Sequence, residues 1–255
     1  MPARRIVSLV PSTTELLCAL GLADALVGVT VYCVEPREVV RGKIRVGGEK
    51  DPDLEAIRRL APDLVVANIE ENRREDVEAL RAAGIEVFIT YPRSVVESFA
   101  MIRELGAATG AAPAAARLLA ELEPLHTAVR ERLAGRRATP CFYPIWREPW
   151  MTIGHDTYIH DLLATCGGAN VFADRSRYPT ISLDDVAARA PEVVLLPDEP
   201  FRFRRAHLRD FEAYPAMPAV RHGRLRLVDG KRFSWHGPRL AEALRTVPEM
   251  LGHLL

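Results

Sequence analysis

The sequence predicts an α/β protein of two Rossmann-like lobes with mainly parallel sheets, joined by one long α-helix. Apolar runs typical of strands alternate with helix-like segments up to residue 93, and the alternation resumes after residue 135. The segment between is helical throughout. With 255 residues and 48% hydrophobic side chains, the chain can build two cores. We therefore expect an N-terminal lobe at 1–93, a helical connector at 94–135 and a C-terminal lobe at 136–255.

The first lobe is expected to contain four strands and three helices. Short apolar runs predict strands at 6–10, 26–31, 64–67 and 87–90. Helices are predicted at 15–20, 54–60 and 74–83. The first helix follows Ser12-Thr13-Thr14-Glu15, which has the form of a capping signal, and ends at Gly21.

The connector is predicted to hold two helices, at 95–109 and 113–133. Pro113 suits the first position of the second helix, and Pro124 is expected to kink it. About 20 residues at 1.5 Å each span ~30 Å, the width of a small domain. This helix is therefore expected to act as a strut.

The second lobe repeats the pattern of the first. Strands are predicted at 141–145, 193–196 and 225–228, and helices at 158–165, 183–189 and 238–251. Residues 15–24 align with 161–170, and Ala61-Pro62-Asp63 with its flanks aligns with Ala190-Pro191-Glu192. Shared helix-stop chemistry would explain one such match. Two matches in the same order favour two related lobes.

Composition excludes several classes of protein. Lys+Arg and Asp+Glu both total 34, so the chain lacks the positive field that nucleic acid or an anionic membrane requires. Four cysteines in this length do not form a disulfide scaffold. No apolar window reaches the ~18 residues of a membrane span. We expect a monomer that neither binds nucleic acid nor inserts into a membrane.

The first residues bear on the compartment. The apolar run after Arg4 and Arg5 stops at Pro11, and a signal peptide needs roughly 7–15 such residues. Cys18 follows Leu17, not the small residue of a lipoprotein cleavage site. As written, the chain is expected in the cytoplasm; a start placed too far downstream would instead indicate the periplasm or cell surface.

A ligand site is expected in the cleft between the lobes, lined by loops after the carboxyl ends of the parallel strands. These loops are 11–14, 32–36, 47–51 and 68–72 in the first lobe, and 146–150, 175–179, 198–204 and 232–237 in the second. The first loop makes Ser12 and Thr13 candidate ligand-binding residues.

Aromatic side chains gather in the second set of loops, which indicates a flat, partly apolar ligand. They are Trp146, Trp150, Tyr178, Phe201, Phe203 and Trp235. Trp150 is expected to pack at the base of its loop, whereas Trp146 and Trp235 have polar neighbours and are the stronger ligand contacts.

Catalytic and metal signals are weak. The chain has no nucleophile elbow, phosphate loop or dinucleotide fingerprint, so we predict no catalytic residue. His155 and His160 are five apart and do not share a helix face. His236 is either an axial ligand to a metal centre in the cleft or a donor to a ligand or helix. A tetrapyrrole chelatase, or a cytoplasmic protein that handles a metal or corrinoid, is the alternative to a binding protein.

Several segments resemble the class III substrate-binding proteins of ABC importers, the helical-backbone metal receptors that carry cobalamin, ferric siderophores or haem. They are residues 5–16, 61–66, 166–172 and 178–182. The resemblance covers almost the whole chain and is strongest to the cobalamin-binding branch. It implies a non-catalytic receptor with no intrinsic cofactor, whose ligand is cobalamin or another metal chelate.

The resemblance also implies roles for individual residues. Lobe-one ligand contacts fall at Tyr32, Glu49 and Asn68, although a cobalamin binder would have aromatics at more of these positions. Lobe-two contacts fall at Trp146, Tyr178, Trp235 and His236. An ABC permease would dock on Glu55 and Asp184, which are also equivalent in the internal repeat. Both lie in the first turn of a predicted helix, where a carboxylate is favourable without any partner.

Overall fold

The computed structural model describes residues 5–253 and divides into two compact α/β units. The first unit contains residues up to Pro92, Val96–Glu123 and Trp235–Pro238, and the second contains the rest. The predicted division into two lobes is therefore confirmed. The predicted boundaries at residues 93 and 135 stay predictions.

The first unit is built on a five-stranded parallel sheet with the order β3-β2-β1-β4-β5. The strands are β1 (Ile6–Ser8), β2 (Leu26–Val29), β3 (Ile44–Arg45), β4 (Leu64–Asn68) and β5 (Glu86–Thr90). The helices are α1 (Pro11–Ala19), α2 (Arg37–Val40), α3 (Leu54–Arg59), α4 (Arg74–Ala82) and α5 (Val95–Ala108). Alternate side chains of the central strands, among them Val7, Val65 and Ala67, pack with Ile57 and Leu80 in one buried core.

Helix α1 begins earlier than the sequence predicts. It starts at Pro11, and its N-cap, Val10, makes no side-chain cap bond, so the expected cap over Ser12–Glu15 is wrong. The hydroxyls of Thr13 and Thr14 donate back to the Val10 carbonyl at 3.0 and 2.9 Å. Proline at the first helical position needs no hydrogen-bond partner for its nitrogen, which permits this early start.

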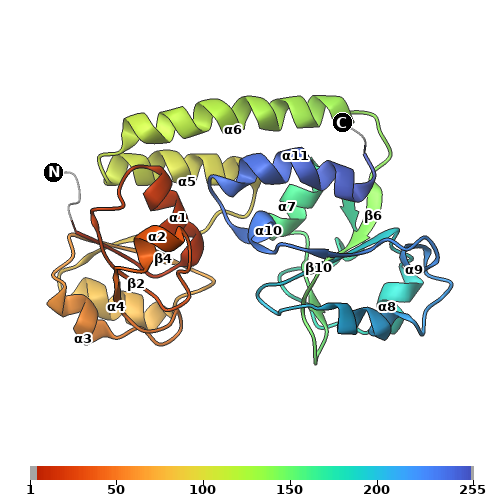
Figure 1. Ribbon diagram of the computed structural model, residues 1–255, viewed down its shortest axis with the longest axis horizontal. Helices are drawn as coiled ribbons and strands as arrows, with labels where there is room; N and C mark the ends of the chain where they lie inside the picture. The colour runs from red at the N-terminus through yellow and green to blue at the C-terminus, as the bar shows by residue number, and fades with distance from the viewer. Residues whose placement is uncertain (1–4, 254–255) are drawn as a thin grey trace. The chain divides into compact units, whose positions relative to one another are not determined.

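Helices α5 and α6 (Ala112–Leu133) follow the first sheet. They approach so closely near their connection that a side chain at Gly106 would lie 2.5 Å from the Ala115 Cβ atom. Helix α6 is one continuous helix (Figure 1). Pro124 lies inside it, and the division between the units falls at this residue.

The second unit contains a four-stranded parallel sheet, ordered β11-β10-β6-β9, and a β7-β8 hairpin. The strands are β6 (Thr139–Phe142), β7 (Pro144–Trp146), β8 (Met151–Thr152), β9 (Gly168–Asn170), β10 (Val193–Pro197) and β11 (Leu225–Val228). The helices are α7 (Tyr158–Thr165), α8 (Leu183–Ala188), the 3-10 helix η1 (Arg205–Phe211), α9 (Pro218–Arg221), α10 (Lys231–Ser234) and α11 (Arg239–Leu251). The predicted strand at 141–145 is instead two short strands.

The internal repeat is also present in the three-dimensional structure. The strand order β2-β1-β4-β5 of the first unit corresponds to β9-β6-β10-β11 of the second. Ala61 and Ala190, which match in sequence, both have left-handed backbones, with φ of 42° and 50°. Such a conformation is unfavourable for alanine by about 1–2 kcal/mol. The same unusual turn at the same place shows that the two units share one βα design.

Tyr143 follows β6 and offers a stability test. Its side chain is 1% exposed, its ring packs 5.2 Å from that of Phe233, and its hydroxyl has no hydrogen-bond partner. Burial, with Glu199 nearby, raises the pKa of this phenol well above 10.

An unsatisfied buried polar group costs about 1–3 kcal/mol. We expect Tyr143→Phe to leave the free energy of unfolding unchanged or to raise it by up to about 2 kcal/mol, measured by urea titration. A loss of more than about 1 kcal/mol would show that the hydroxyl is satisfied after all.

Candidate ligand-binding site

Exposed apolar side chains follow two strands of the first sheet at their carboxyl ends. Tyr32 comes after β2 and is 57% exposed, and its neighbours Val31 and Val34 are exposed as well. Ile69, which follows β4, is 57% exposed. Large apolar side chains on a surface mark interaction sites when they gather in one region. Tyr32 is therefore exposed, and its role as a ligand contact stays a prediction.

Ser12 and Thr13, by contrast, lie inside the first unit. Ser12 is buried and Thr13 is completely inaccessible. The Thr13 hydroxyl lies 3.0 Å from Ser8 Oγ, within a polar cluster that also contains Thr14 and Cys33. Burial is the main cause of the raised pKa of the Cys33 thiol. The prediction that Thr13 contacts a ligand is wrong, because its hydroxyl instead fixes the turn between β1 and α1.

Asn68 is also a structural residue. It is 5% exposed, and its amide nitrogen donates to Thr90 Oγ1 at 3.1 Å. Its side-chain oxygen accepts from the Glu70 backbone at 2.8 Å, and its own backbone N–H donates to Asn72 Oδ1 at 2.8 Å. These bonds fix the loop after β4, and the buried amide group is hydrogen-bonded within the protein and not exposed to a ligand. Glu49 is half-buried, and its carbonyl accepts from Asn72 Nδ2 at 3.0 Å.

Trp146 and Phe201 come together in the second unit. Trp146 ends β7 and is 43% exposed, and its ring stands edge-on to the Phe201 ring with 5.6 Å between centroids. Phe201 packs in turn on buried Phe203 at 4.8 Å. An exposed indole supported from behind by a second ring offers a fixed apolar face for a flat ligand.

Trp150 packs at the base of its loop, as predicted. Its ring stacks on Phe203 at 5.6 Å and meets the edge of Phe211 at 5.7 Å. It lies against the core of the second unit, which includes Phe142 and Leu196. This tryptophan supports the loop that carries Trp146.

Tyr178 is half-buried beside a strained residue. The Arg177 guanidinium carbon lies 5.1 Å from the centre of the Tyr178 ring, and Arg177 has φ of 55°. The Arg177 backbone N–H donates to Asp156 Oδ1 at 2.6 Å, and this bond is the main cause of the lowered pKa of that carboxyl. Left-handed backbone in a non-glycine residue is uncommon and persists only where the surroundings impose it.

Trp235 and His236 differ from the prediction in place and exposure. They belong to the first unit, although the sequence places them among second-lobe loops. Trp235 is only 6% exposed, so its ring packs inside the protein and does not offer a face to a ligand. His236 is less than half exposed, and burial lowers its pKa from 6.5 to about 4.

The histidine at 236 predicts a loss of stability in acid. The unfolded chain takes up a proton at this side chain below pH 6.5, whereas the folded chain resists until about pH 4. The free energy of unfolding should therefore fall as the pH drops through this range. We expect His236→Asn to flatten the decline between pH 7 and pH 5, measured by urea titration at each pH. An equally steep decline in the variant would assign it to His126 and His160, whose pKa values burial also lowers.

The remaining histidine candidates make internal contacts. His155 Nδ1 lies 2.7 Å from the Arg175 carbonyl, and His160 Nδ1 lies 3.3 Å from Asn170 Nδ2. Within residues 5–253, no group of three or more His, Cys, Asp or Glu side chains is placed to hold a metal ion. No helix in the described part of the chain is long and apolar enough to cross a membrane.

The two docking candidates have defined surroundings. Glu55 lies in the first turn of α3, whose N-cap Asp53 accepts from the Ala56 backbone, and it pairs with exposed Arg58. Asp184 lies in the first turn of α8, and its carboxylate accepts from the Tyr214 hydroxyl at 2.7 Å. Both carboxylates are solvent-accessible at the start of equivalent helices.

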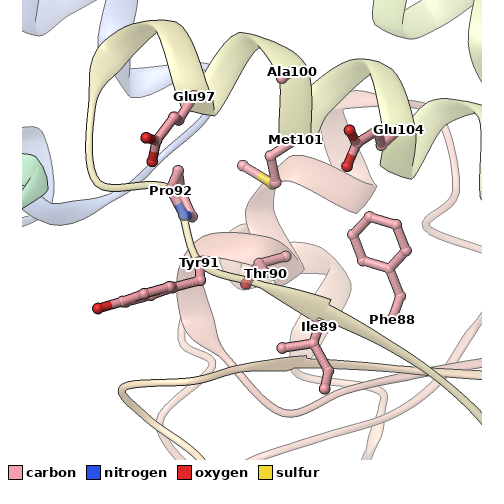
Figure 2. Close-up of a pocket in the computed structure, with 9 residues that line it drawn as sticks. All are labelled: Phe88, Ile89, Thr90, Tyr91, Pro92, Glu97, Ala100, Met101 and Glu104. Atoms are coloured by element: carbon pink, nitrogen blue, oxygen red, sulfur yellow. The ribbon is translucent and has the colours of Figure 1, made fainter.

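A shallow pocket between β5 and α5 contains none of the predicted site residues. Figure 2 shows Met101 facing the strand, with Glu97 and Glu104 on either side of it along α5. Its lining is Phe88, Ile89, Thr90, Tyr91, Pro92, Glu97, Ala100, Met101 and Glu104.

The site residues predicted from the sequence do not include a group of arginines that follows Phe201, the ring in contact with Trp146. Arg202, Arg204, Arg205 and Arg209 follow Phe201 and are all exposed. The signal was available, since these four lie within eight residues of a chain whose charges balance.

Comparison with known proteins places the chain among binding proteins. The family model described as periplasmic binding protein matches residues 6–231. The vitamin B12-binding protein of Yersinia pestis (strain Pestoides F) is 32% identical over 196 residues, which cover 76% of this chain and 69% of that protein.

Solved structures agree over almost the full length. The crystal structure of the periplasmic vitamin B12 binding protein BtuF of Vibrio cholerae has a TM-score of 0.84 at 25% identity and covers 98% of this chain and 97% of its own. The periplasmic heme-binding protein RhuT from Roseiflexus sp. RS-1, in apo form, has a TM-score of 0.86 at 26% identity and covers 98% of both chains.

Proposed function

The chain belongs to the periplasmic binding proteins, which are transport receptors and not enzymes. We propose that it binds a planar metal chelate, which is either haem or a corrinoid such as cobalamin. The names of its relatives point to these two ligands. Family membership also removes the chelatase alternative. The ligand is cargo, and the protein needs no cofactor of its own.

One observation carries the proposal: the exposed, ring-supported indole of Trp146 at a strand end of the second unit. In the first unit Tyr32 supplies a second exposed ring. Binding would rest on apolar contact with ring faces, and few polar groups would orient the ligand. Glu49, Tyr178, Phe201 and His236 stay candidate contacts.

Titration tests the proposal directly. Cyanocobalamin, haem and ferrichrome are added in turn, and the visible spectrum of the ligand and tryptophan fluorescence are followed. We expect a saturable response to cyanocobalamin or haem, with quenching from Trp146. No response from any of the three would rule out this class of ligand.

We further propose that Glu55 and Asp184 are the permease contacts of the protein. Their place at the start of equivalent helices supports this pairing. Replacing both by arginine should abolish uptake of labelled ligand by cells and leave its affinity for the purified protein unchanged. Unchanged uptake would remove these residues from docking.

The family is periplasmic by description. The cytoplasmic location stays a prediction, as does the monomeric state. Fractionation of cells producing the full-length protein, followed by size-exclusion chromatography, checks both.

A further inference from the structure

The exposed arginines after β10 form a charged rim, defined here as Arg202, Arg204 and Arg205. None of the three makes an ion pair with any residue of the described chain. Arg147, by contrast, pairs with Asp210 at 2.7 Å. Like charges this close along the chain repel one another.

The loop that carries the rim is rigidly held. The Phe203 backbone N–H donates to the Pro197 carbonyl at 3.0 Å, and the buried Phe203 ring anchors the segment. The Arg204 backbone N–H donates to His207 Nδ1 at 3.0 Å. The Phe203 N–H also lies 3.0 Å from the Phe201 carbonyl, so the backbone turns at Arg202. Phe201 packs on buried Phe203, whereas Arg202 and Arg204 are exposed.

The rim begins next to the proposed ligand face. Phe201, whose ring supports Trp146 at 5.6 Å, immediately precedes Arg202. The loop also follows the carboxyl end of β10, the edge where ligands of parallel sheets bind. A flat ligand lying on Trp146 would bring its peripheral substituents toward the rim.

We infer that the ligand carries carboxylate or phosphate groups at its periphery, and that Arg202, Arg204 and Arg205 bind them. Guanidinium groups match the planar, bidentate geometry of both anions. This inference rests on the proposed function, since it assigns the chemistry of the same ligand's edge. It makes the positively charged rim a determinant of specificity, while the aromatic faces supply most of the affinity.

Two pairs of probes test it, and the member called anionic is the one that carries a peripheral anionic group absent from its partner. Haem carries free propionates that its dimethyl ester lacks, and cyanocobalamin carries a phosphodiester that dicyanocobinamide lacks. The first pair tests carboxylate and the second tests phosphate. Dissociation constants are measured by absorbance at low and high salt for the native protein and two variants.

The test variant is R202Q/R204Q/R205Q, and the control R41Q/R117Q/R132Q removes the same charge from exposed, unpaired arginines elsewhere. The native protein and the control should prefer the anionic member of at least one pair by about tenfold, and this preference should shrink in high salt. The test variant should bind both members alike. If the preference survives in the test variant, or if the native protein shows none in either pair, the inference about the arginine rim is wrong while the proposed function stands. If none of the four probes binds the native protein, the proposed function fails with it.

Discussion

Replacing Trp146 by alanine is expected to weaken binding of cyanocobalamin or haem by tenfold or more. The ring is 43% exposed and packs against Phe201, so its exposed face is accessible to a ligand. Buried tryptophans at binding sites commonly contribute about 2 kcal/mol or more when truncated. Fluorescence or absorbance titration measures the effect.

Stability provides the control for this variant. Because the indole is largely solvated, the free energy of unfolding should fall by no more than about 1.5 kcal/mol, the energy of one aromatic pair. Trp146→Phe keeps a ring at the same place and should retain most of the affinity. Native affinity in the alanine variant would show that the ligand does not touch this face.

Replacing Trp235 by alanine is expected to have the opposite profile. This side chain is 6% exposed, and truncating a buried tryptophan costs about 3–5 kcal/mol of unfolding free energy. Urea denaturation of the ligand-free protein measures the loss, and Trp235→Phe should recover much of it. A stable alanine variant with impaired ligand binding would return Trp235 to the list of ligand contacts.

The comparison of these two tryptophans shows what sequence patterns cannot resolve. Both lie in the second half of the sequence and have polar neighbours, yet Trp146 is exposed and Trp235 is buried. The difference arises from which segments pack over each residue, and residues 235–238 associate with the first unit, far away in the sequence. Asn68 shows the same limit, because its role depends on Thr90, which lies on the adjacent strand.

The fold was easier to predict because its signals are local. Continuous apolar runs such as β4 and β10 are buried at every position, and helix-stopping glycines mark the ends of α1 and α7. The elements that were missed lack such signals. Strand β9 is Gly-Ala-Asn, and both residues of β3 are exposed, so neighbouring strands and not their own side chains make them part of a sheet.

The left-handed alanines at 61 and 190 have a consequence for the origin of the protein. Two independent domains would not be expected to adopt the same unfavourable alanine turn before the same proline and in the same strand order. Duplication of a gene for a single half, followed by fusion, accounts for both copies at once. Glu55 and Asp184, in the first turns of the equivalent helices α3 and α8, would then descend from one ancestral residue.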